Sequence, residues 1–302
     1  MGKNGTRDNG SFSRIAFHKM NNALLGQHDV IASFVLYGTA IDEVTQAVQQ
    51  ALNNEHNVYV VLVDNSVPPL NLPNYDAARV KLIRSGANLG YGRGHNLAIK
   101  WGQGRSRYHL VMNTDLTYGK GVIDVLTTFM DARLDVGLTM PKVLYPDGRI
   151  QRLCRLLPSP ADLLGRRFFS WTGWAKRRNR LYEFHDWNYD RVGSFPFLSG
   201  CFMMMRRSVL DTVGGFDERY FLYAEDLDLS RRIHCCSETL FIPDVQVVHE
   251  YRSEGGRGIM RLLYGLRSLS QYFSKWGWFF DYERVAINQR TAAALQRHND
   301  RD

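Results

Sequence analysis

The sequence contains no apolar run long enough to cross a membrane. Its longest hydrophobic stretches, at residues 30–37 and 58–63, have the length of a strand, whereas a spanning helix needs about 20 residues. Residues 1–22 are polar and contain no apolar segment of the kind found in a secretory signal. These segments therefore predict neither a membrane-spanning nor an exported protein.

Cysteine is scarce, and the four cysteines follow no recognisable pattern. Cys154 and Cys201 stand alone, Cys235 and Cys236 are adjacent, and no C-x-x-C pair occurs. Disulfide frameworks and zinc sites use regularly spaced cysteines. We therefore expect a reduced, cytoplasmic protein with neither feature.

Acidic residues are outnumbered by basic ones. Asp and Glu total 30 against 38 Lys and Arg, which gives a net charge of +8. This charge suits a partner that carries phosphate or an anionic membrane surface. Of the 302 residues, 44% are hydrophobic and 23% charged, a composition that excludes disorder for most of the chain. The length allows one large α/β domain or two small ones.

Short apolar runs alternate with helical patterns along the chain. The run at 30–37 ends at Gly38 and precedes a stretch at 41–52 whose apolar residues have helical spacing. Continuous apolar strands that alternate with helices predict a mostly parallel sheet covered by helices on both faces. Further strands are predicted at 58–63, 80–83, 108–112, 197–205, 240–242 and 245–248, and further helices at 97–101, 122–130, 225–234 and within 260–295.

Polar residues follow two of the predicted strands, at the edge where such sheets bind ligands. Asp115 comes directly after one strand, and its carboxylate could hold a magnesium or manganese ion that bridges two phosphates. Asp64 follows another strand and could accept the N3–H of a uracil or thymine ring. An ordinary turn explains either residue almost as well.

A glycine-rich loop, with Gly90, Gly92 and Gly94, lies between a strand and a helix. Backbone N–H groups at the start of a helix can hold a diphosphate, and Arg93 would add a charged contact. The spacing is not that of the dinucleotide-binding loop, and glycines also occur simply to make turns. Both interpretations therefore stay open.

The densest acidic cluster lies in residues 214–232. Glu225, Asp226 and Asp228 fall in the first turn of a predicted helix, where acids also stabilise the helix dipole. Beside a nucleotide site, one of them could act as a general base. His249, which ends a strand-like run, could bind a metal ion or a phosphate, although a lone histidine is more often structural.

In combination, these segments resemble family 2 glycosyltransferases, in particular the bacterial rhamnosyltransferase-like group. The resemblance covers about residues 30–250, and its motifs occur in the family's order. They are V-L-V-D-N-S at 61–66, N-L-G-Y-G-R-G-H-N at 88–96, L-S-G-C at 198–201, G-G-F-D at 214–217 and Y-A-E-D at 223–226.

The resemblance implies a glycosyltransferase A-type fold, a nucleotide-sugar donor, a divalent cation (Mn²⁺ or Mg²⁺) and inversion at the anomeric carbon. Asp226 would be the catalytic base, and Asp115 and His249 the metal ligands. The donor side would comprise Tyr37, Asp64, Asn65, Asn88, Gly90, Gly92, Arg93, Asn96, Asn113 and Asp115, and the acceptor side Ser199, Gly200, Asp217 and Glu225.

Two positions depart from the family pattern. The family's D-x-D motif reads Asn113, Thr114, Asp115, so only Asp115 offers a carboxylate to a metal ion. Asn-Pro-Asp occurs at this place in many rhamnosyltransferase-like members. The first strand ends in Leu36, Tyr37 and Gly38 instead of the usual T-Y-N, which weakens the assignment of Tyr37 to the base.

The expected domain organisation follows from these motifs. Residues 1–27 form a polar extension, 28–250 the catalytic domain, and 251–302 a C-terminal helical segment that associates with a membrane or with a second copy. Within the catalytic domain, the nucleotide-binding half covers about 28–140 and the acceptor half about 141–250.

The predicted function is transfer of a sugar, with rhamnose favoured by the resemblance, from a dTDP- or UDP-sugar to a polyprenyl-linked bacterial surface glycan. Basic and aromatic residues mix within 152–180 and 275–280, a composition that favours docking on the anionic inner face of the inner membrane. A solvated basic face over core aromatics explains these segments equally well.

Two other classes of function compete with this one. A sugar-phosphate nucleotidyltransferase would need a glycine-rich, lysine-containing loop after the first strand, and Gly38, Thr39 and Ala40 do not provide it. A non-enzymatic protein that binds membranes or nucleic acid would explain the positive charge. Acids at the strand ends would repel phosphates, so nucleic acid is not an expected partner.

Overall fold

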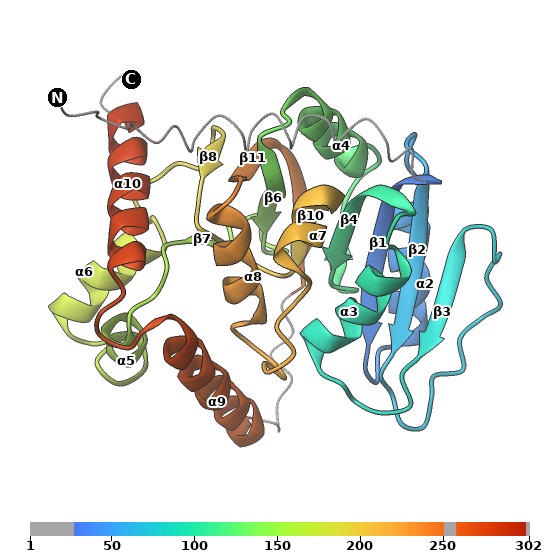
Figure 1. The fold of residues 1–302 in the computed structure, drawn as a ribbon, viewed down its shortest axis with the longest axis horizontal. Coiled ribbons are helices and arrows are strands. Elements are labelled where there is room, and N and C mark those ends of the chain that lie inside the picture. Colours follow the sequence, from blue (N-terminus) through green and yellow to red (C-terminus); the bar gives the residue numbers. More distant parts are fainter. Residues whose placement is uncertain (1–26, 251–257, 300–302) are drawn as a thin grey trace, which may run out of the picture.

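The computed structural model describes residues 27–250 and 258–299. The predicted extension at 1–27 lies outside the described residues except for its last residue. Figure 1 shows the elements, whose order and bounds are β1 (His28–Leu36), α2 (Ile41–Leu52), β2 (Val58–Asp64), β3 (Val80–Arg84), α3 (Tyr91–Trp101), β4 (Ser106–Met112), β5 (Leu116–Thr117), α4 (Val122–Ala132), β6 (Val136–Leu144), β7 (Cys154–Arg155), α5 (Pro160–Phe168), α6 (Gly173–Tyr182), β8 (Gly193–Ser194), β9 (Phe197–Leu198), β10 (Phe202–Arg206), α7 (Arg207–Val213), α8 (Glu225–His234), β11 (Glu238–His249), α9 (Gly258–Trp276) and α10 (Tyr282–Asn299).

One mixed, mostly parallel sheet organises the described chain. Its strand order is β3-β2-β1-β4-β10-β6-β11-β5, with β8 paired to β11. The β1–β2, β2–β3, β1–β4 and β6–β11 pairs are parallel, whereas β10 runs antiparallel between β4 and β6. All seven residues of β2 are buried, as expected for a strand with both faces covered.

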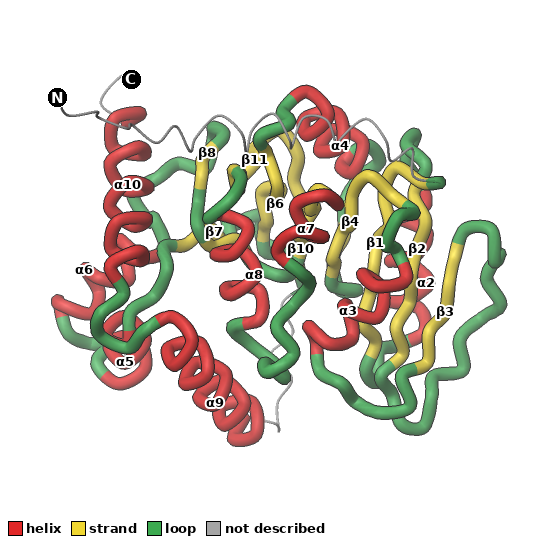
Figure 2. Tube along the Cα trace, viewed as in Figure 1, coloured by secondary structure: helices red, strands yellow, loops and turns green. Residues whose placement is uncertain are grey.

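Helices cover both faces of this sheet, as the sequence predicts. The apolar sides of α2 and α4 join one core cluster with alternate residues of β1, such as Val30 and Phe34. The opposite face is covered by α3, α7 and α8, which lie at the front of Figure 2. Because β1 is parallel to both β2 and β4, the carboxyl ends of these three strands meet at one edge of the sheet, the lower edge in Figure 1.

The C-terminal helices α9 and α10 are packed onto α5 and α8. One core cluster contains Leu227 of α8, Tyr272 of α9 and Ile287 of α10, with Leu163 of α5 against it. Among the described residues, no helix is long and apolar enough to span a bilayer. The four cysteines are all free.

Several element boundaries differ from the predicted ones. The helix predicted at 97–101 begins six residues earlier, at Tyr91, so two glycines of the predicted loop lie inside it. The two runs at 240–242 and 245–248 form one strand, β11, interrupted by a register shift between Ile242 and Gln246. The predicted strand at 197–205 is divided by a turn into β9 and β10.

Candidate active site

A cavity of about 450 Å³ lies where the carboxyl ends of β1 and β2 meet the start of α3. Three separate parts of the chain line it: the β1–α3 region, the loop before α8, and the first turns of α9. Its lining residues are Val35, Tyr37, Asn65, Asn88, Gly90, Tyr91, Phe221, Leu222, Met260, Arg261 and Tyr264. Four of the predicted donor-side residues, Tyr37, Asn65, Asn88 and Gly90, are thus brought together.

Side-chain amides hold the glycine loop against this cavity. The Asn65 side-chain N–H donates to the Gly90 carbonyl at 3.0 Å, and the Asn88 Oδ1 accepts from the Gly90 N–H at 3.0 Å. The buried Asn65 Oδ1 has no hydrogen-bond partner within the described chain. A buried acceptor without a partner is costly, so this oxygen is available to a donor group on a ligand.

Asp64 lies beneath the cavity edge and holds the loop that follows β2. Its two carboxylate oxygens accept from the backbone N–H groups of Ser66 at 2.9 Å and Leu70 at 2.8 Å. Asp64 is buried and does not line the cavity. The geometry therefore gives it a direct role in shaping the loop.

The glycines provide space for close packing. Gly90 has a φ of +81°, and a Cβ there would lie 2.0 Å from the Phe221 carbonyl oxygen. A Cβ on Gly92 would lie 2.9 Å from Phe216, and one on Gly94 would lie 2.7 Å from Val35. Gly90 and Gly92 thus let α3 approach the segment before α8.

Two other predicted donor-side residues, Arg93 and Asn96, contact the segment before α8 and not the cavity. Arg93 is about half exposed and forms an ion pair with Glu218 at 3.6 Å. Asn96 uses its side-chain amide on the backbone of Phe216, donating to the carbonyl and accepting from the N–H, both at 2.8 Å. Neither residue lines the cavity.

A second polar group forms where β4 and β11 end. The Asp115 Oδ1 lies 3.3 Å from the His249 Nε2, and the Asn113 Nδ2 lies 3.4 Å from the same nitrogen. The His249 Nδ1 faces the Gln151 Oε1 at 3.1 Å. If Nδ1 carries the proton, Nε2 presents a lone pair towards Asp115.

This group fits one side of a divalent-cation site. A carboxylate oxygen and an imidazole nitrogen within 3.3 Å of each other can share one ion. Within residues 27–250 and 258–299, no three His, Cys, Asp or Glu side chains form a complete ligand cluster. Magnesium and manganese sites in phosphate chemistry commonly take their other ligands from water and substrate phosphates.

The acidic pair at the start of α8 faces the same region. Asp226 Oδ2 accepts from the Gly200 N–H at 2.8 Å, and the Tyr91 hydroxyl donates to the Gly200 carbonyl at 2.6 Å. The same hydroxyl lies 3.2 Å from the Asn113 Oδ1. Tyr91 and Gly200 therefore connect the Asp226 carboxylate to the end of β4.

Burial perturbs both carboxyl groups. Loss of solvation raises the pKa of Glu225 to about 8, and the neighbouring Asp226 contributes to the shift. Loss of solvation also raises the pKa of Asp226, against the N–H groups of Gly200 and Leu227, which lower it. A paired shift of this kind is typical of functional sites, although structural clusters also produce it.

The backbone before α8 is strained. Tyr223 and Ala224 both have positive φ angles, of 69° and 63°. A left-handed conformation costs a residue other than glycine about 1–2 kcal/mol. The surrounding structure must offset this cost to hold the two carboxyl groups in place.

The sequence matches a known family across this region. Residues 36–214 match the model of glycosyl transferase family 2. The chain belongs to glycosyltransferase family 2. It is 32% identical over 228 residues to an N-acetylglucosaminyl-diphospho-decaprenol L-rhamnosyltransferase of Mycobacterium tuberculosis, an alignment that covers 68% of this chain and 71% of the relative.

Solved structures show the same fold at low sequence identity. GalNAc-T7, crystallised with UDP, GalNAc and Mn²⁺, gives a TM-score of 0.58 at 14% identity and covers 83% of this chain and 48% of its own. A mannosyltransferase from Pyrobaculum calidifontis, in complex with GDP-Man and Mn²⁺, gives 0.51 at 14% identity and covers 87% and 71%. The glycosyltransferase A-type fold is therefore confirmed.

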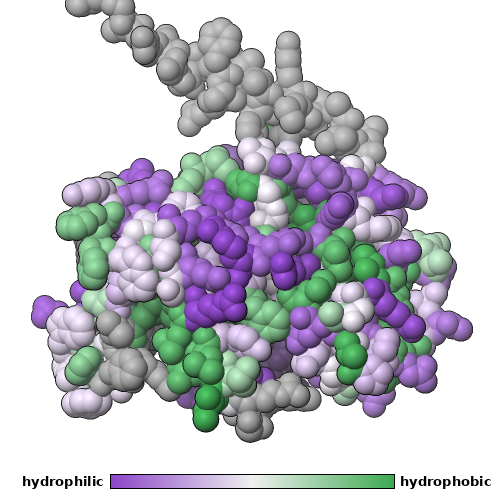
Figure 3. All heavy atoms as spheres, turned by 60° about the horizontal axis from the view of Figure 1, so that its bottom comes forward, coloured by the Kyte–Doolittle hydropathy of each residue, from purple (hydrophilic) through white to green (hydrophobic). Residues whose placement is uncertain are grey.

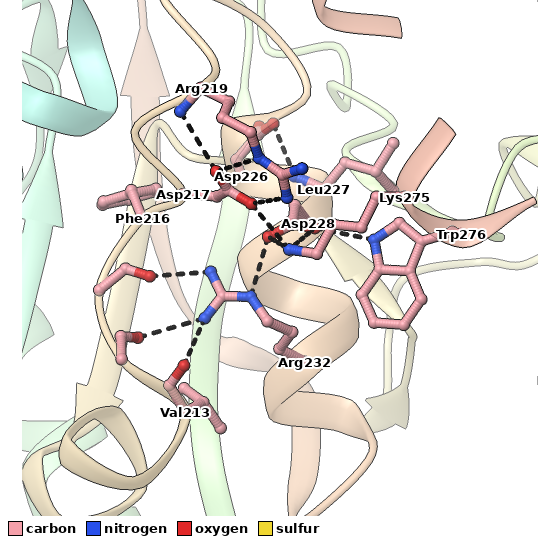
Figure 4. Close-up of polar contacts among 12 residues, drawn as sticks. Val213, Phe216, Asp217, Arg219, Asp226, Leu227, Asp228, Arg232, Lys275 and Trp276 are labelled. Carbon is pink, nitrogen blue, oxygen red and sulfur yellow. Dashed lines mark hydrogen bonds and ion pairs between the residues drawn. The ribbon is translucent and has the colours of Figure 1, made fainter. Parts of the chain in front are cut away.

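In this family 2 glycosyltransferase, the acidic helix is fixed by the C-terminal helices (Figure 4). Asp228 is fully buried and accepts from Lys275 at 2.9 Å, from the Trp276 indole N–H at 2.8 Å and from Arg232 at 2.8 Å. Lys275 also contacts Asp217 at 2.9 Å. Asp217, predicted on the acceptor side, thus lies in this network, and Arg219 and Lys275 hold the pKa of its carboxyl well below the usual range.

A second buried ion pair lies one turn further along α8. Arg231 is 1% exposed and contacts the Asp281 carboxylate with both terminal nitrogens, at 2.7 and 2.8 Å. Its guanidinium also lies 4.0 Å from the centre of the Trp276 ring. Lys275 and Trp276, which begin one of the two segments considered for membrane docking, therefore point inwards.

Sequence reasoning missed three residues that shape the site. Tyr91 stands in the quoted glycine motif, which was a usable signal for its contact with Gly200. Gln151, which holds His249, and Lys275, which holds Asp228, lie outside every motif. The predicted acceptor-side residue Ser199 is partly buried beside Gly200.

Proposed function

We propose that this glycosyltransferase inverts the anomeric carbon of a nucleoside-diphosphate sugar, with Asp226 as the general base. The observation that supports this role is the connection from the Asp226 carboxylate through Gly200 and Tyr91 to Asn113. It brings a partly buried carboxyl group close to the strand end where the donor's diphosphate would lie. A base works best when its pKa is near the working pH, and burial raises the pKa of Asp226.

The proposed reaction is a single displacement. Asp226 takes the proton of an acceptor hydroxyl, and the oxygen forms a bond to the anomeric carbon of the donor sugar. The bond from that carbon to the diphosphate oxygen breaks, and the nucleoside diphosphate leaves. Asp115 and His249 would hold a divalent cation, which when bound supplies positive charge at the leaving diphosphate.

The donor would occupy the cavity at the ends of β1 and β2. The side chains of Tyr37, Asn65 and Asn88 line it, and the unpartnered Asn65 Oδ1 could accept the N3–H of a uracil or thymine ring. We therefore favour a UDP- or dTDP-sugar. The name of the M. tuberculosis relative, an L-rhamnosyltransferase, favours rhamnose as the sugar.

The acceptor would be a lipid-linked glycan. The relative's name specifies N-acetylglucosaminyl-diphospho-decaprenol, and a related polyprenyl-diphosphate acceptor would place this enzyme at the cytoplasmic face of a bacterial inner membrane. Glu225, beside the proposed base and raised in pKa by burial, would donate a hydrogen bond to the acceptor sugar when protonated.

Substitution of Asp226 by Asn tests the proposed base. The variant keeps the size of the side chain but cannot take the proton, so transfer should fall by about 10²-fold or more. Binding of the donor should persist, measured as the rise in melting temperature with UDP- or dTDP-sugar and Mn²⁺; a ligand at about 100 times its Kd adds about 2.7 kcal/mol. The control Asp135→Asn changes an exposed carboxylate and should leave both readouts unchanged. Near-normal turnover by Asp226→Asn would refute the assignment.

A further inference from the structure

Within the described part of the chain, an uncovered apolar surface runs along the amino-terminal half of α9. Ile259, Met260, Leu263 and Leu266, here called the α9 stripe, are 76%, 52%, 53% and 52% exposed. Their spacing of three and four residues places them on one side of the helix. In Figure 3, hydrophobic side chains gather over α9. Contiguous apolar surface of this kind on a protein marks an interaction site.

The α9 stripe lies at the mouth of the candidate donor cavity. Met260 belongs to both the stripe and the cavity wall, and Tyr264 of the same helix lines the cavity against Phe221, with ring centres 4.6 Å apart. Whatever covers the stripe therefore lies directly beside the substrate entrance.

The other half of α9 is firmly anchored. Ser268 donates to the Leu222 carbonyl at 2.8 Å, and Tyr272 and Phe273 are buried. Lys275 and Trp276 add the contacts to Asp228. The stripe is thus presented by a fixed helix, not by a loose end.

Basic side chains line a second hollow, on α6. A cavity of about 490 Å³ on α6 is lined by Lys176, Arg177, Arg180 and His185, among others. Arg180 and His185 have acidic partners, Asp186 and Glu183, whereas Lys176 and Arg177 form no ion pair with any described residue. Both α6 and α9 lie along the lower left of Figure 1, and α5, which packs on α6, shares a core cluster with α9 through Leu163.

Two exposed tryptophans are sequence neighbours of residues that line this cavity, Ser170 and Ala175. Trp171 and Trp174 are 71% and 51% exposed. Tryptophan favours the boundary between lipid headgroups and acyl chains, and lysine and arginine favour anionic headgroups. A second copy of the chain would bring like charges together on this side, whereas an anionic bilayer complements them.

We propose that the α9 stripe inserts into the headgroup region of an anionic lipid bilayer, with Lys176 and Arg177 against lipid phosphates. The cavity mouth then opens at the membrane surface. This inference rests on the proposed function, because only a lipid-linked acceptor requires the entrance to face the bilayer. It goes further by naming the surface and the partner.

Flotation of the whole chain with lipid vesicles tests the surface. Wild type should bind vesicles of phosphatidylcholine with phosphatidylglycerol, and bind those of phosphatidylcholine alone more weakly. Leu263→Gln with Leu266→Gln should weaken binding about tenfold or more, because two exposed apolar side chains no longer partition. Neither leucine lines the donor cavity.

Matched variants test whether the loss of vesicle binding is specific to the α9 stripe or follows from any loss of exposed apolar side chains. Val125→Gln with Leu134→Gln alters apolar residues of similar exposure, 41% and 47%. They lie in and beside α4, at the top of Figure 1, whereas α9 lies at the bottom, and this variant should bind like wild type. Lys176→Gln with Arg177→Gln should weaken binding to anionic vesicles about 10- to 30-fold at low salt. Unchanged binding by the stripe variant, or its conversion of a dimer to a monomer, would overturn the proposal.

Two acceptors distinguish failure of this inference from failure of the proposed function. N-acetylglucosaminyl diphosphate with a short alkyl chain is presented in solution, and the same headgroup with a polyprenyl chain is presented in vesicles. The stripe variant should lose about tenfold in kcat/KM only with the vesicle acceptor. Equal rates for variant and wild type on vesicles overturn the membrane surface. No transfer by wild type to either acceptor overturns the proposed function itself, and with it the requirement for this surface.

Discussion

The two halves of the sheet hold their polar residues by different means. In the amino-terminal half, β1, β2 and β4 are packed with apolar side chains, and a buried group of uncharged polar side chains lies among them. Ser33 Oγ lies 2.8 Å from His95 Nδ1 and 3.0 Å from His109 Nε2. Burial lowers the pKa of His95 to about 3 and that of His109 well below its usual range, so both rings stay uncharged.

The carboxyl-terminal half uses buried charges instead. Asp228 and Arg231, both on α8, are almost fully buried, and their partners Lys275 and Asp281 come from α9 and from the residue just before α10. The candidate donor edge is thus a product of sheet topology and of hydrogen bonds between side chains and the backbone. The acidic pair depends in addition on ion pairs supplied by the C-terminal segment, which makes that segment part of the site.

Removal of Arg231 should have the largest effect on stability. Arg231→Leu leaves the Asp281 carboxylate buried without its bidentate partner, a change that typically costs about 3–5 kcal/mol. Urea unfolding of the whole chain measures it. The control Arg133→Gln breaks an ion pair whose side chains are about half exposed and should cost about 0.5 kcal/mol or less. If the two variants lost the same free energy of unfolding, the buried ion pair of α8 would stabilise the chain no more than an exposed one.

The pH dependence of stability should reveal the buried acid in the second half. Because the pKa of Glu225 is raised to about 8 in the folded chain, the folded state holds its proton where the unfolded state has released it. The contribution of Glu225 to the free energy of unfolding therefore has its full value below about pH 4.5, and it is lost as the pH rises to about 8. Between pH 5 and 8 the wild type should lose about 3–4 kcal/mol from this site.

Glu225→Gln isolates that contribution. Glutamine keeps the shape and stays neutral, so the variant should be as stable as wild type near pH 5 and more stable at pH 8, measured by urea unfolding at both values. Glu218→Gln, on an exposed carboxylate, serves as the control and should follow wild type. If the free energy of unfolding of Glu225→Gln fell between pH 5 and 8 as steeply as that of wild type, Glu225 would be ionised in the folded chain.

The sequence predicts the first half of the molecule well, because its strands are continuous apolar runs that end in polar residues. Asn65, Asn88 and Gly90 meet at one cavity for that reason: parallel strands end at one edge. The sequence predicts that the helix begins at residue 97, whereas α3 begins at Tyr91, because glycines indicate a loop unless their packing neighbours are known. Gly92 and Gly94 are tolerated in α3 because close packing requires them.

The second half was predicted less completely for a physical reason. Ion pairs such as Asp228 with Lys275 join residues 47 positions apart, and no local pattern records such a pairing. Composition leaves membrane docking and a solvated basic face as equal alternatives for residues 275–280, and neither predicts that Lys275 and Trp276 contact α8. The sequence of α9 does not show which of its apolar residues are exposed, because its buried side is determined by contacts with α5 and α8.

The smallest predicted effect concerns the amino-terminal half, where packing and not charge holds the site. In Gly94→Ala, the new Cβ would lie 2.7 Å from Val35 Cγ2 and 3.2 Å from Asn65 Nδ2. Overpacking typically costs about 1–3 kcal/mol, and alanine returns up to about 1 kcal/mol of helix propensity, so the net loss should be about 1 kcal/mol.

Because Val35 and Asn65 line the cavity, Gly94→Ala should also reduce the melting-temperature shift with a nucleotide sugar. Gly173→Ala, in a helix with open space around the glycine, should be neutral or slightly stabilising and leave nucleotide binding intact. If Gly94→Ala unfolded at the same urea concentration as wild type and bound nucleotide equally well, close packing of α3 on β1 would not be what fixes the candidate donor edge. The contrast between a packed half and a charge-paired half would then rest on α8 alone.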